Sequence, residues 1–337
     1  MVNLLFTGAT GYIGSSVVSA FLDHPDRSNI TITALVRNAE KAEKLKTYGI
    51  NAVVGDHTDA ALFEKLASEA DYYFSTADAD NIAVAKTALS GLKKRYEATG
   101  VKSAFIHISG TGVLADDAKG EFSDVIYYDN KPEQIAALPP TQLHRDLELL
   151  LVDADKEGYV NTYVISPCTI WGRPQHKLAK SGVVHTFSIQ VPALIKVSLA
   201  RGAGGYAGKG ENIWDNVNID DLGDFYVKFY NHIRTNPGAG HGHTGYYFVV
   251  AGEHKLKQVG EAIGKALFEL GKINSPVATQ FKQEELDQFF GGFQRYFSCN
   301  ARARGPQARA TGWVPTKTGQ DFLDSIKPEA EALLATL

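Results

Sequence analysis

The fold is decided by residues 4–14, which read Leu-Leu-Phe-Thr-Gly-Ala-Thr-Gly-Tyr-Ile-Gly. A short apolar run leads directly into three glycines at the spacing GxxGxxG, and apolar residues at helical spacing follow over residues 15–22. Such a turn between a strand and a helix leaves free backbone N–H groups at the helix N-terminus, where a phosphate can bind. The sequence therefore predicts a strand, a phosphate-binding turn and a helix at the start of the chain.

Each glycine of this turn has an expected task. Gly8 permits a tight turn, Gly11 lets a pyrophosphate approach the backbone, and Gly14 lets the helix pack closely on the sheet. The spacing differs from the common GxGxxG pattern, but the physical requirements are the same. We expect the dinucleotide to be bound here by Gly8, Thr10, Gly11, Tyr12, Ile13 and Gly14.

The first half of the chain alternates apolar runs with helical patterns. Further strands are expected over residues 30–36, 52–54, 71–75, 104–108 and 162–166. This alternation predicts βαβ units, and hence an α/β fold with a doubly wound parallel sheet. With 337 residues, the chain has room for a smaller C-terminal region as well. We expect a cofactor domain over residues 1–170 and a mainly substrate-binding region over 171–337, with segments after 215 returning to the first domain.

The end of the second strand indicates which dinucleotide is bound. An NAD site would place an acidic residue here, but the chain has Arg37, followed by Lys41 and Lys44. Because a guanidinium reads phosphate well, Arg37 favours NADP(H), although a solvated surface arginine would give the same sequence. Asp56, after the third strand, is either a partner of the adenine amino group or a turn residue. Small residues after the fourth strand leave room for the cofactor: Ser75, Thr76 and Ala77.

Composition excludes several classes of protein. Lys and Arg number 34 against 38 Asp and Glu, so the net charge is −4. The chain therefore lacks the excess of positive charge that is typical of a nucleic-acid binder. No apolar run reaches the length that a membrane span needs. The two cysteines, Cys168 and Cys299, form no disulfide framework or zinc spacing, which favours a reducing, cytoplasmic location. The first residues contain no basic region or cleavage site of a signal peptide.

These motifs, in their order along the chain, resemble the extended branch of the short-chain dehydrogenase/reductase superfamily. After the glycine-rich turn, the similarity continues with Leu-Val-Arg at 35–37, Gly-Asp at 55–56, Ile-Ser-Gly-Thr at 108–111, Ser-Pro-Cys-Thr-Ile-Trp-Gly at 166–172, Val-Asn-Ile-Asp-Asp-Leu at 217–222 and Thr-Gly-Trp-Val-Pro at 311–315. The resemblance implies a Rossmann fold of the epimerase/reductase type, with the nicotinamide near Ser109 and Pro167.

The resemblance also implies a catalytic Ser or Thr after the fifth strand and a Tyr-x-x-x-Lys pair on a later helix. Ser109 matches the first requirement, with Thr111 in reserve. The pair is absent from the expected helix over 142–155. When Glu148 is aligned with the acidic position of the family, His144 stands in place of the Lys and Pro140 in place of the Tyr.

Two other groups are therefore candidates for the proton chemistry. Tyr127 and Lys131 have the required spacing but lie upstream, in the long loop over 110–140. We favour Tyr127 as the proton donor and expect His144 to hold the cofactor ribose, although an imidazole could also move the proton. A packed Tyr127 and a structural His144 are the alternatives. Arg145 is expected to be a surface partner of an acidic residue.

The substrate side is less defined. A small, apolar or aromatic substrate is expected, and the aromatic residues that could line its pocket are Trp171, Phe187, Tyr206, Trp214 and Phe293. The stretch over 202–210 lacks the GK[ST] of a phosphate loop and is interpreted as a flexible connection. No metal site is expected, and a homodimer is considered as the assembly. The sequence thus predicts an NADPH-dependent reductase of a carbonyl, imine or activated double bond. A redox-inactive NADP-binding sensor and an epimerase or dehydratase of the same fold are the alternatives.

Overall fold

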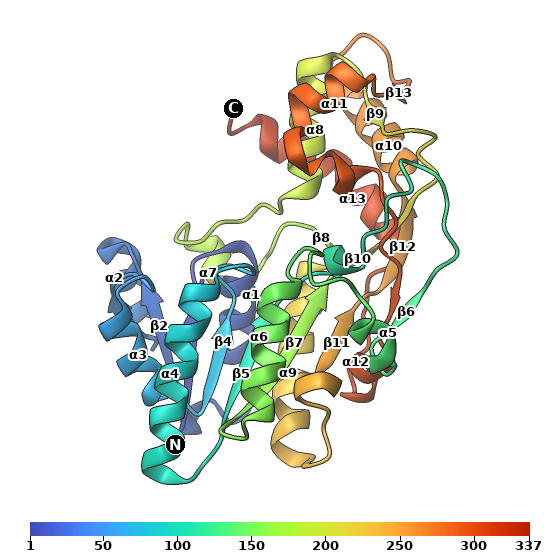
Figure 1. Cartoon of the computed structure of the whole chain (residues 1–337). Helices are drawn as coiled ribbons and strands as arrows, with labels where there is room; N and C mark the ends of the chain where they lie inside the picture. The colour runs from blue at the N-terminus through green and yellow to red at the C-terminus, as the bar shows by residue number, and fades with distance from the viewer.

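The structure is a computed structural model that describes residues 1–291 and 295–337, together with the backbone course of the intervening turn. Its centre is a seven-stranded sheet in the order β11-β7-β5-β4-β1-β2-β3 (Figure 1). All neighbouring strands are parallel. The strands are β1 (Val2–Thr7), β2 (Ile30–Val36), β3 (Asn51–Val54), β4 (Tyr72–Ser75), β5 (Ser103–Ile108), β7 (Val160–Pro167) and β11 (Tyr246–Val249).

Helices cover both faces of this sheet, as a doubly wound fold requires (Figure 1). One face carries α1 (Tyr12–Leu22) and α9 (Ile219–Thr235), which pack on one another. The other carries α3 (Ala60–Ser68), α4 (Ile82–Thr99) and α6 (Arg145–Lys156). Beside β3, at the edge of the sheet, lies α2 (Ala39–Lys46). The strand order reverses between β1 and β4, so the carboxyl ends of these strands flank the crevice in which α/β proteins bind ligands.

The central strands are buried on both faces, which explains their continuous apolar sequences. Phe6 stacks on Phe74 across β1 and β4, with ring centroids 4.6 Å apart. On the α1 side, Phe21 of α1 and Tyr230 of α9 extend the same cluster. The core on each face fixes the sheet rigidly beneath the glycine-rich turn.

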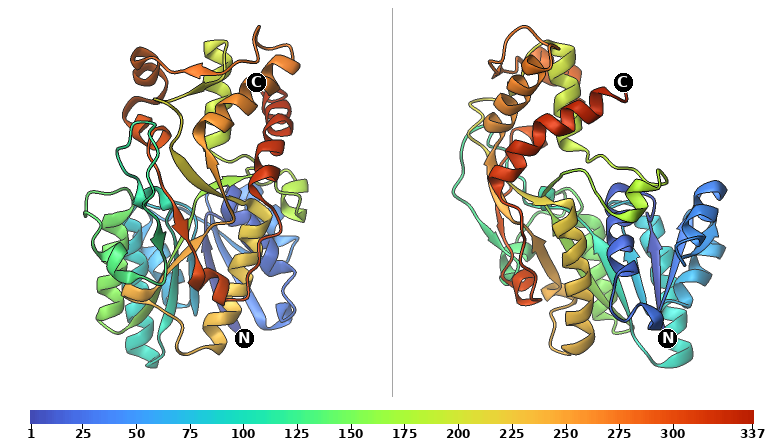
Figure 2. Two further views of the ribbon diagram at one scale, coloured as in Figure 1. Left: turned by 90° about the vertical axis from the view of Figure 1, so that its right-hand side faces the viewer. Right: turned by 180° about the vertical axis from the view of Figure 1, so that it is seen from behind.

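A smaller region lies beyond the carboxyl ends of the strands, at the top of Figure 1 and in both views of Figure 2. Its three-stranded sheet has the order β12-β10-β8, made of β12 (Gly252–Lys255), β10 (Ile213–Asn218) and β8 (Thr169–Trp171). Four helices surround a separate apolar cluster there: α8 (Gln190–Arg201), α10 (Leu256–Glu269), α11 (Gln283–Phe290) and α13 (Gly319–Leu334).

Short elements complete the two regions. Two small sheets pair β9 (Gly205–Tyr206) with β13 (Thr279–Gln280), and β6 (Tyr127–Tyr128) with β14 (Ala303–Arg304). The remaining short helices are α5 (Pro132–Ala136), α7 (Lys177–Lys180) and α12 (Pro306–Ala310). Short 3₁₀ turns are η1 (Arg27–Asn29), η2 (Thr111–Leu114), η3 (Gly242–Thr244) and η4 (Gly291–Phe297).

The stretch over 202–210 is packed rather than a flexible connection. A Cβ added to Gly204 would lie 2.4 Å from Gly260 O, and one added to Gly205 would lie 2.5 Å from the Phe281 ring. Glycine is therefore required by close packing of this strand on α10. The expectation of flexibility was wrong because small residues serve close approach as well as mobility.

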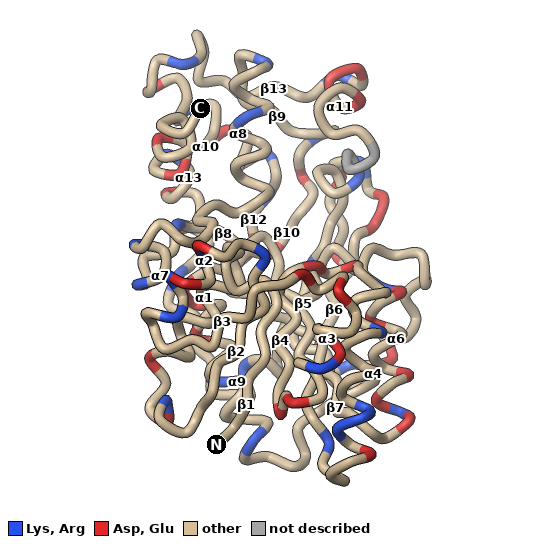
Figure 3. Tube along the Cα trace, turned by 90° about the vertical axis from the view of Figure 1, so that its left-hand side faces the viewer, with Lys and Arg blue, Asp and Glu red and all other residues tan. Residues whose placement is uncertain are grey.

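Charged residues of both signs alternate along the chain. Figure 3 shows Lys and Arg interspersed with Asp and Glu along the trace. Among the helices that the structure describes, none combines the length and the apolar character that crossing a membrane requires.

Candidate active site

The glycine-rich turn joins β1 to α1 and has a fixed shape. Gly8 adopts φ +81°, and the Gly11 N–H donates to Gly8 O at 2.8 Å. A Cβ on Gly8 would lie 2.6 Å from the Thr76 backbone, at the start of the loop after β4. Only glycine combines this left-handed backbone with so close an approach.

The other two glycines differ in what surrounds them. A Cβ on Gly14 would lie 2.2 Å from Gly8 O and 2.5 Å from Thr76 Oγ1, so this position needs glycine for packing. A Cβ on Gly11 would meet only Gly8 O, at 3.1 Å, and Gly11 lines an open cleft. This pattern fits a role of Gly11 in admitting a ligand at the N-terminus of α1.

The cleft has a volume of about 460 Å³ and runs between the turn, the end of β2 and the loop after β4. It is lined by Thr7, Gly8, Thr10, Gly11, Leu35, Val36, Arg37, Lys41, Gly55, His57, Thr76, Ala77 and Asp78. Six of the expected cofactor residues therefore meet in one place: Gly8, Thr10, Gly11, Arg37, Thr76 and Ala77.

Some of the expected cofactor residues lie beside this cleft rather than in its lining. Tyr12 is buried, and its hydroxyl donates to Gly172 O at 2.6 Å, so it connects α1 to the residue that directly follows β8. Ile13 packs against the apolar core on the same face of the sheet. Ser75 is buried at the end of β4, directly before the lining residue Thr76.

Basic side chains gather at the β2 end of the cleft. Arg37 is 83% exposed at its side chain, and Lys41 and His57 line the same end. The Arg37 Nε lies 4.0 Å from Asp56 Oδ2, a loose contact that leaves the guanidinium available. Asp56 itself accepts from Thr58 N and Oγ1 at 2.9 and 2.8 Å, and these hydrogen bonds lower its pKa.

Ser109 follows β5 and belongs to a buried polar cluster. Its Oγ donates to Glu148 Oε1 at 2.6 Å, and the other carboxylate oxygen lies 3.2 Å from Arg145 Nη1. The same Arg145 nitrogen donates to the Tyr246 hydroxyl at 2.7 Å. Burial raises the pKa of Glu148 to about 7, against the opposing effects of Ser109 and Arg145. The cluster thus fixes the Ser109 hydroxyl and couples it to a titratable carboxyl group.

His144 stands directly before α6, with a left-handed backbone at φ +68°. Its Nδ1 lies 2.6 Å from Asp80 Oδ1, which comes from the loop after β4. A Cβ added to Gly110 would lie 3.3 Å from His144 Nε2 and 3.7 Å from Pro167 O, so this ring nitrogen faces the segment after Ser109. Asp80 orients the imidazole, and Nε2 is left for other partners.

Tyr127 and Lys131 lie in a different setting. Tyr127 belongs to β6, where its N–H donates to Arg302 O at 3.0 Å. Burial, with a smaller contribution from Asp116, raises its pKa. Lys131 Nζ lies 4.5 Å from the centre of the Tyr128 ring. Among the described residues, no hydrogen bond joins either side chain to Ser109 or His144.

Two expectations about α6 were wrong. Arg145 is 4% exposed and is a buried partner of Glu148 and Tyr246, not a surface residue. The helix begins at Arg145 rather than near residue 142, because the left-handed conformation of His144 interrupts the helical path. Sequence spacing alone shows neither the buried carboxylate that Arg145 neutralises nor this backbone conformation.

Asp80 was the functional candidate that sequence reasoning missed. It lies 64 residues before His144, in a loop whose sequence is Ser-Thr-Ala-Asp-Ala-Asp over 75–80. The only signal was its place after a central strand, at the carboxyl edge where ligands bind. Glu148 had been placed by the family pattern, but its hydrogen bond to Ser109 had not been expected.

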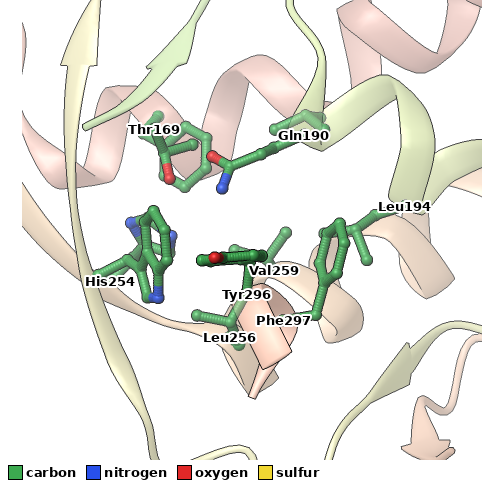
Figure 4. Close-up of a pocket in the computed structure, with 11 residues that line it drawn as sticks. Thr169, Gln190, Leu194, His254, Leu256, Val259, Tyr296 and Phe297 are labelled. Atoms are coloured by element: carbon green, nitrogen blue, oxygen red, sulfur yellow. The ribbon is translucent and has the colours of Figure 1, made fainter. Parts of the chain in front are cut away.

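A narrow apolar pocket lies in the smaller region (Figure 4). Of the aromatic residues expected at the substrate, Trp214 lines it, together with Tyr296, Phe297 and Phe322. Trp171, Phe187 and Tyr206 do not belong to this lining, and the side chain of Phe293 lies outside the described residues. In the part of the chain that the structure describes, no group of three or more His, Cys, Asp or Glu could hold a metal ion.

Comparisons with known proteins show what the chain is similar to. Residues 2–133 match the NmrA-like family. The oxidase ucsJ of an Acremonium species is 29% identical over 335 residues, which cover 92% of this chain and 91% of that protein.

Two solved structures illustrate the fold. The UDP-glucose 4-epimerase of Thermotoga maritima is 19% identical over 99% of both chains, with a TM-score of 0.64. The dTDP-glucose 4,6-dehydratase DesIV of Streptomyces venezuelae, solved with NAD bound, is 16% identical over 98% of this chain and 97% of that one, with a TM-score of 0.65. The chain therefore has the Rossmann-type fold of these two enzymes, and its residues 2–133 are similar to the NmrA-like family.

Proposed function

We propose that the protein is an NADPH-dependent oxidoreductase that reduces a carbonyl, an imine or an activated double bond of a small, apolar or aromatic metabolite. One observation carries the proposal: the loop after β4 lines the glycine-rich cleft with Thr76 and Ala77 and also supplies Asp80 to His144. A dinucleotide cleft and a polar reaction centre thus share one loop.

The residues present fit a dinucleotide phosphate. Gly11 leaves open space at the N-terminus of α1, where backbone N–H groups stabilise a pyrophosphate. Arg37 and Lys41 would hold the 2′-phosphate, which distinguishes NADP from NAD. Ser109, His144 and Pro167 would lie at the nicotinamide end, in keeping with the switch point of the sheet. When bound, NADPH supplies a hydride.

The side chains of this protein would then manage the oxygen of the substrate. Reduction of a carbonyl leaves an alkoxide, which must be stabilised and protonated. The Ser109 hydroxyl would donate a hydrogen bond to this oxygen when Glu148 is protonated, because the Glu148 carboxyl group then donates to Ser109 Oγ. His144 exchanges the proton through Nε2, while Asp80 holds Nδ1. Tyr127 stays a second candidate for the proton donor.

The absence of Tyr-x-x-x-Lys from α6 also favours a redox-inactive NADP-binding sensor. A sensor would keep the cleft and the cations at its rim, but it would not need a polarised Ser109 or an oriented imidazole. The epimerase and dehydratase neighbours suggest the third reading, in which the cofactor is restored in each turnover. The free cysteines, Cys168 and Cys299, support a reducing, cytoplasmic location for any of the three.

The test is a screen of aldehydes, ketones, imines and enones with the purified protein and NADPH, followed by absorbance of the reduced nicotinamide. We expect at least one class to consume NADPH in proportion to enzyme concentration. NADPH that binds tightly and is consumed with none of these classes would favour the sensor.

A further inference from the structure

A chain of hydrogen bonds crosses the three-stranded sheet of the smaller region. The Trp171 indole Nε1 donates to Asn216 Oδ1 at 3.2 Å, and Asn216 Nδ2 lies 3.2 Å from His254 Nδ1. All three side chains are buried, with exposed fractions of 4%, 0% and 4%. These hydrogen bonds therefore form without competition from bulk water.

The direction of this chain is fixed by its first member. An indole nitrogen is only a donor, so it requires the oxygen of Asn216. The amide nitrogen of Asn216 is then the atom that faces His254, and an amide nitrogen also only donates. His254 Nδ1 must accept, which leaves the ring proton on Nε2. Burial lowers the pKa of His254 to about 3, so the ring is neutral at physiological pH.

His254 therefore presents an N–H donor to the pocket of Figure 4. It lines this pocket with Trp214, Leu256, Tyr296 and Phe322, and Tyr296 lies between His254 and Phe297 in the view. No residue whose side chain the structure describes accepts a hydrogen bond from Nε2. A buried donor without an acceptor is costly, and such a group is a natural anchor for a polar atom of a ligand.

One wall of the pocket follows closely along the chain from the proposed reaction centre. Thr169 of its wall lies two residues after Pro167, on β8, and Asn216 is its partner on β10. Trp214 and His254 face one another across β10 and β12. The charge of Asp80, which holds His144, is among the influences that raise the pKa of Tyr296, another lining residue, burial being the largest.

The free space is small. It amounts to about 10 Å³, which is close to the room that one water molecule needs. A ring does not fit there unless side chains move, whereas one oxygen atom does. The walls are mostly aromatic and aliphatic, so the body of the ligand next to this atom is apolar.

We propose that the substrate carries, besides the group that is reduced, a second oxygen that accepts the hydrogen bond of His254 Nε2. This inference rests on the proposed reductase function and narrows its substrate class to apolar or aromatic compounds with two oxygen functions, such as diketones, keto ethers and keto esters. A ligand whose second polar group is only a donor is disfavoured, because it would face the N–H of His254.

The test is equilibrium binding of a matched series to the protein saturated with NADP⁺, followed by tryptophan fluorescence. The probes are 1-phenylpentane-1,2-dione, the 1,3-dione and the 1,4-dione, with 1-phenylpentan-1-one as the control that lacks the second oxygen. We expect at least one dione to bind about three- to tenfold more tightly than the monoketone, the value of one hydrogen bond. Equal affinities across the series would overturn the proposal.

Two variants connect this preference to His254. His254→Phe keeps a ring against Phe322, whose centre lies 4.6 Å away, but removes the donor, so the preference for the dione should disappear. His254→Gln retains an N–H donor and should keep most of the preference for the dione. NADP⁺ affinity checks that both variants are folded. A preference that survives in His254→Phe would contradict the proposal.

Selective ¹⁵N labelling of histidine provides a measurement that involves no substrate. The spectrum of His254 should be that of a neutral ring protonated on Nε2, and in Trp171→Phe this preference should weaken. Protonation on Nδ1 in the native protein would overturn the inference. Binding selectivity without any turnover would leave the inference standing and would count against the reductase function instead.

Discussion

His144 Nδ1 lies 2.6 Å from Asp80 Oδ1, so a loop residue after β4 orients an imidazole at the start of α6. The contact joins the loop after β4, which lines the glycine-rich cleft, to the helix that carries Glu148. It places a residue able to exchange a proton where the superfamily resemblance leads one to expect a lysine.

Arg37→Ala should weaken NADPH binding about tenfold or more and leave NADH binding nearly unchanged. A charge-assisted hydrogen bond contributes roughly 1.5–3 kcal/mol, and only NADPH carries the 2′-phosphate. Isothermal titration with both cofactors measures the effect. Lys46→Ala is the matched control, because Lys46 is bound to Glu43 at 2.6 Å outside the cleft lining. Equal affinity of the native protein for the two cofactors would refute the assignment of NADP.

Gly11→Val should abolish cofactor binding while the protein stays folded. The new side chain would project into the cleft, and its Cβ would approach only Gly8 O, at 3.1 Å. Gly8→Ala should instead destabilise the protein, since its Cβ would lie 2.6 Å from the Thr76 backbone at φ +81°. Thermal unfolding and NADPH titration separate the two effects. Normal titration of Gly11→Val would show that the cofactor lies elsewhere.

His144→Phe should lower kcat about a hundredfold or more, which is the usual contribution of a general acid. Asp80→Asn should lower it less, because the imidazole stays but loses its charged partner. Tyr127→Phe is the comparison, and we expect it to retain most of the turnover. Steady-state kinetics with a reducible ketone gives all three values. An inactive Tyr127→Phe beside an active His144→Phe would reverse the assignment.

Turnover should fall as the pH rises through about 7, the pKa to which burial raises Glu148. Below this value the protonated carboxyl can donate to Ser109 Oγ and free the Ser109 hydroxyl for the substrate. Above it the carboxylate accepts that proton at 2.6 Å and engages the hydroxyl. In Glu148→Gln the amide donates at every pH, so the ratio of its kcat to that of the native protein should rise across pH 7. A ratio that is independent of pH would exclude this role of Glu148.

The same shift has a consequence for stability. The folded-state pKa of Glu148 lies above its ordinary value of 4.5, so the folded protein holds this proton more tightly than the unfolded chain. The contribution of Glu148 to the free energy of unfolding therefore falls as the pH rises from 4.5 to 7. Glu148→Gln removes this part of the dependence, and melting temperatures of both proteins across this range would show it.

Local sequence was sufficient for the parallel sheet and the glycine-rich turn. The apolar run before Gly8 and the glycine spacing specify one strand–turn–helix unit, and buried parallel strands are visible as continuous apolar segments. The arrangement of Arg37 next to the turn follows from the adjacency of β1 and β2. These features depend on neighbours along the chain or on a simple strand order.

Contacts between distant residues could not be predicted in this way. Asp80 and His144 meet through the packing of α4 and α6, and the burial of Arg145 depends on Glu148 and on Tyr246 from a much later strand. The orientation of His254 depends on Asn216 and Trp171, which lie on two other strands. Side-chain networks of this kind are set by tertiary packing, so a single sequence contains no periodic signal for them.

In the proposed function, a hydride passes from NADPH to a substrate of this protein. The most direct measurement is transfer of deuterium from NADPH labelled at C4, in separate reactions with each of the two stereoisomers, followed by mass spectrometry of the product of an accepted ketone. One deuterium is expected on the former carbonyl carbon with one isomer and none with the other. This transfer should be lost in His144→Phe with NADPH still bound. Tight binding of NADPH with no deuterium in any product would refute the reductase function.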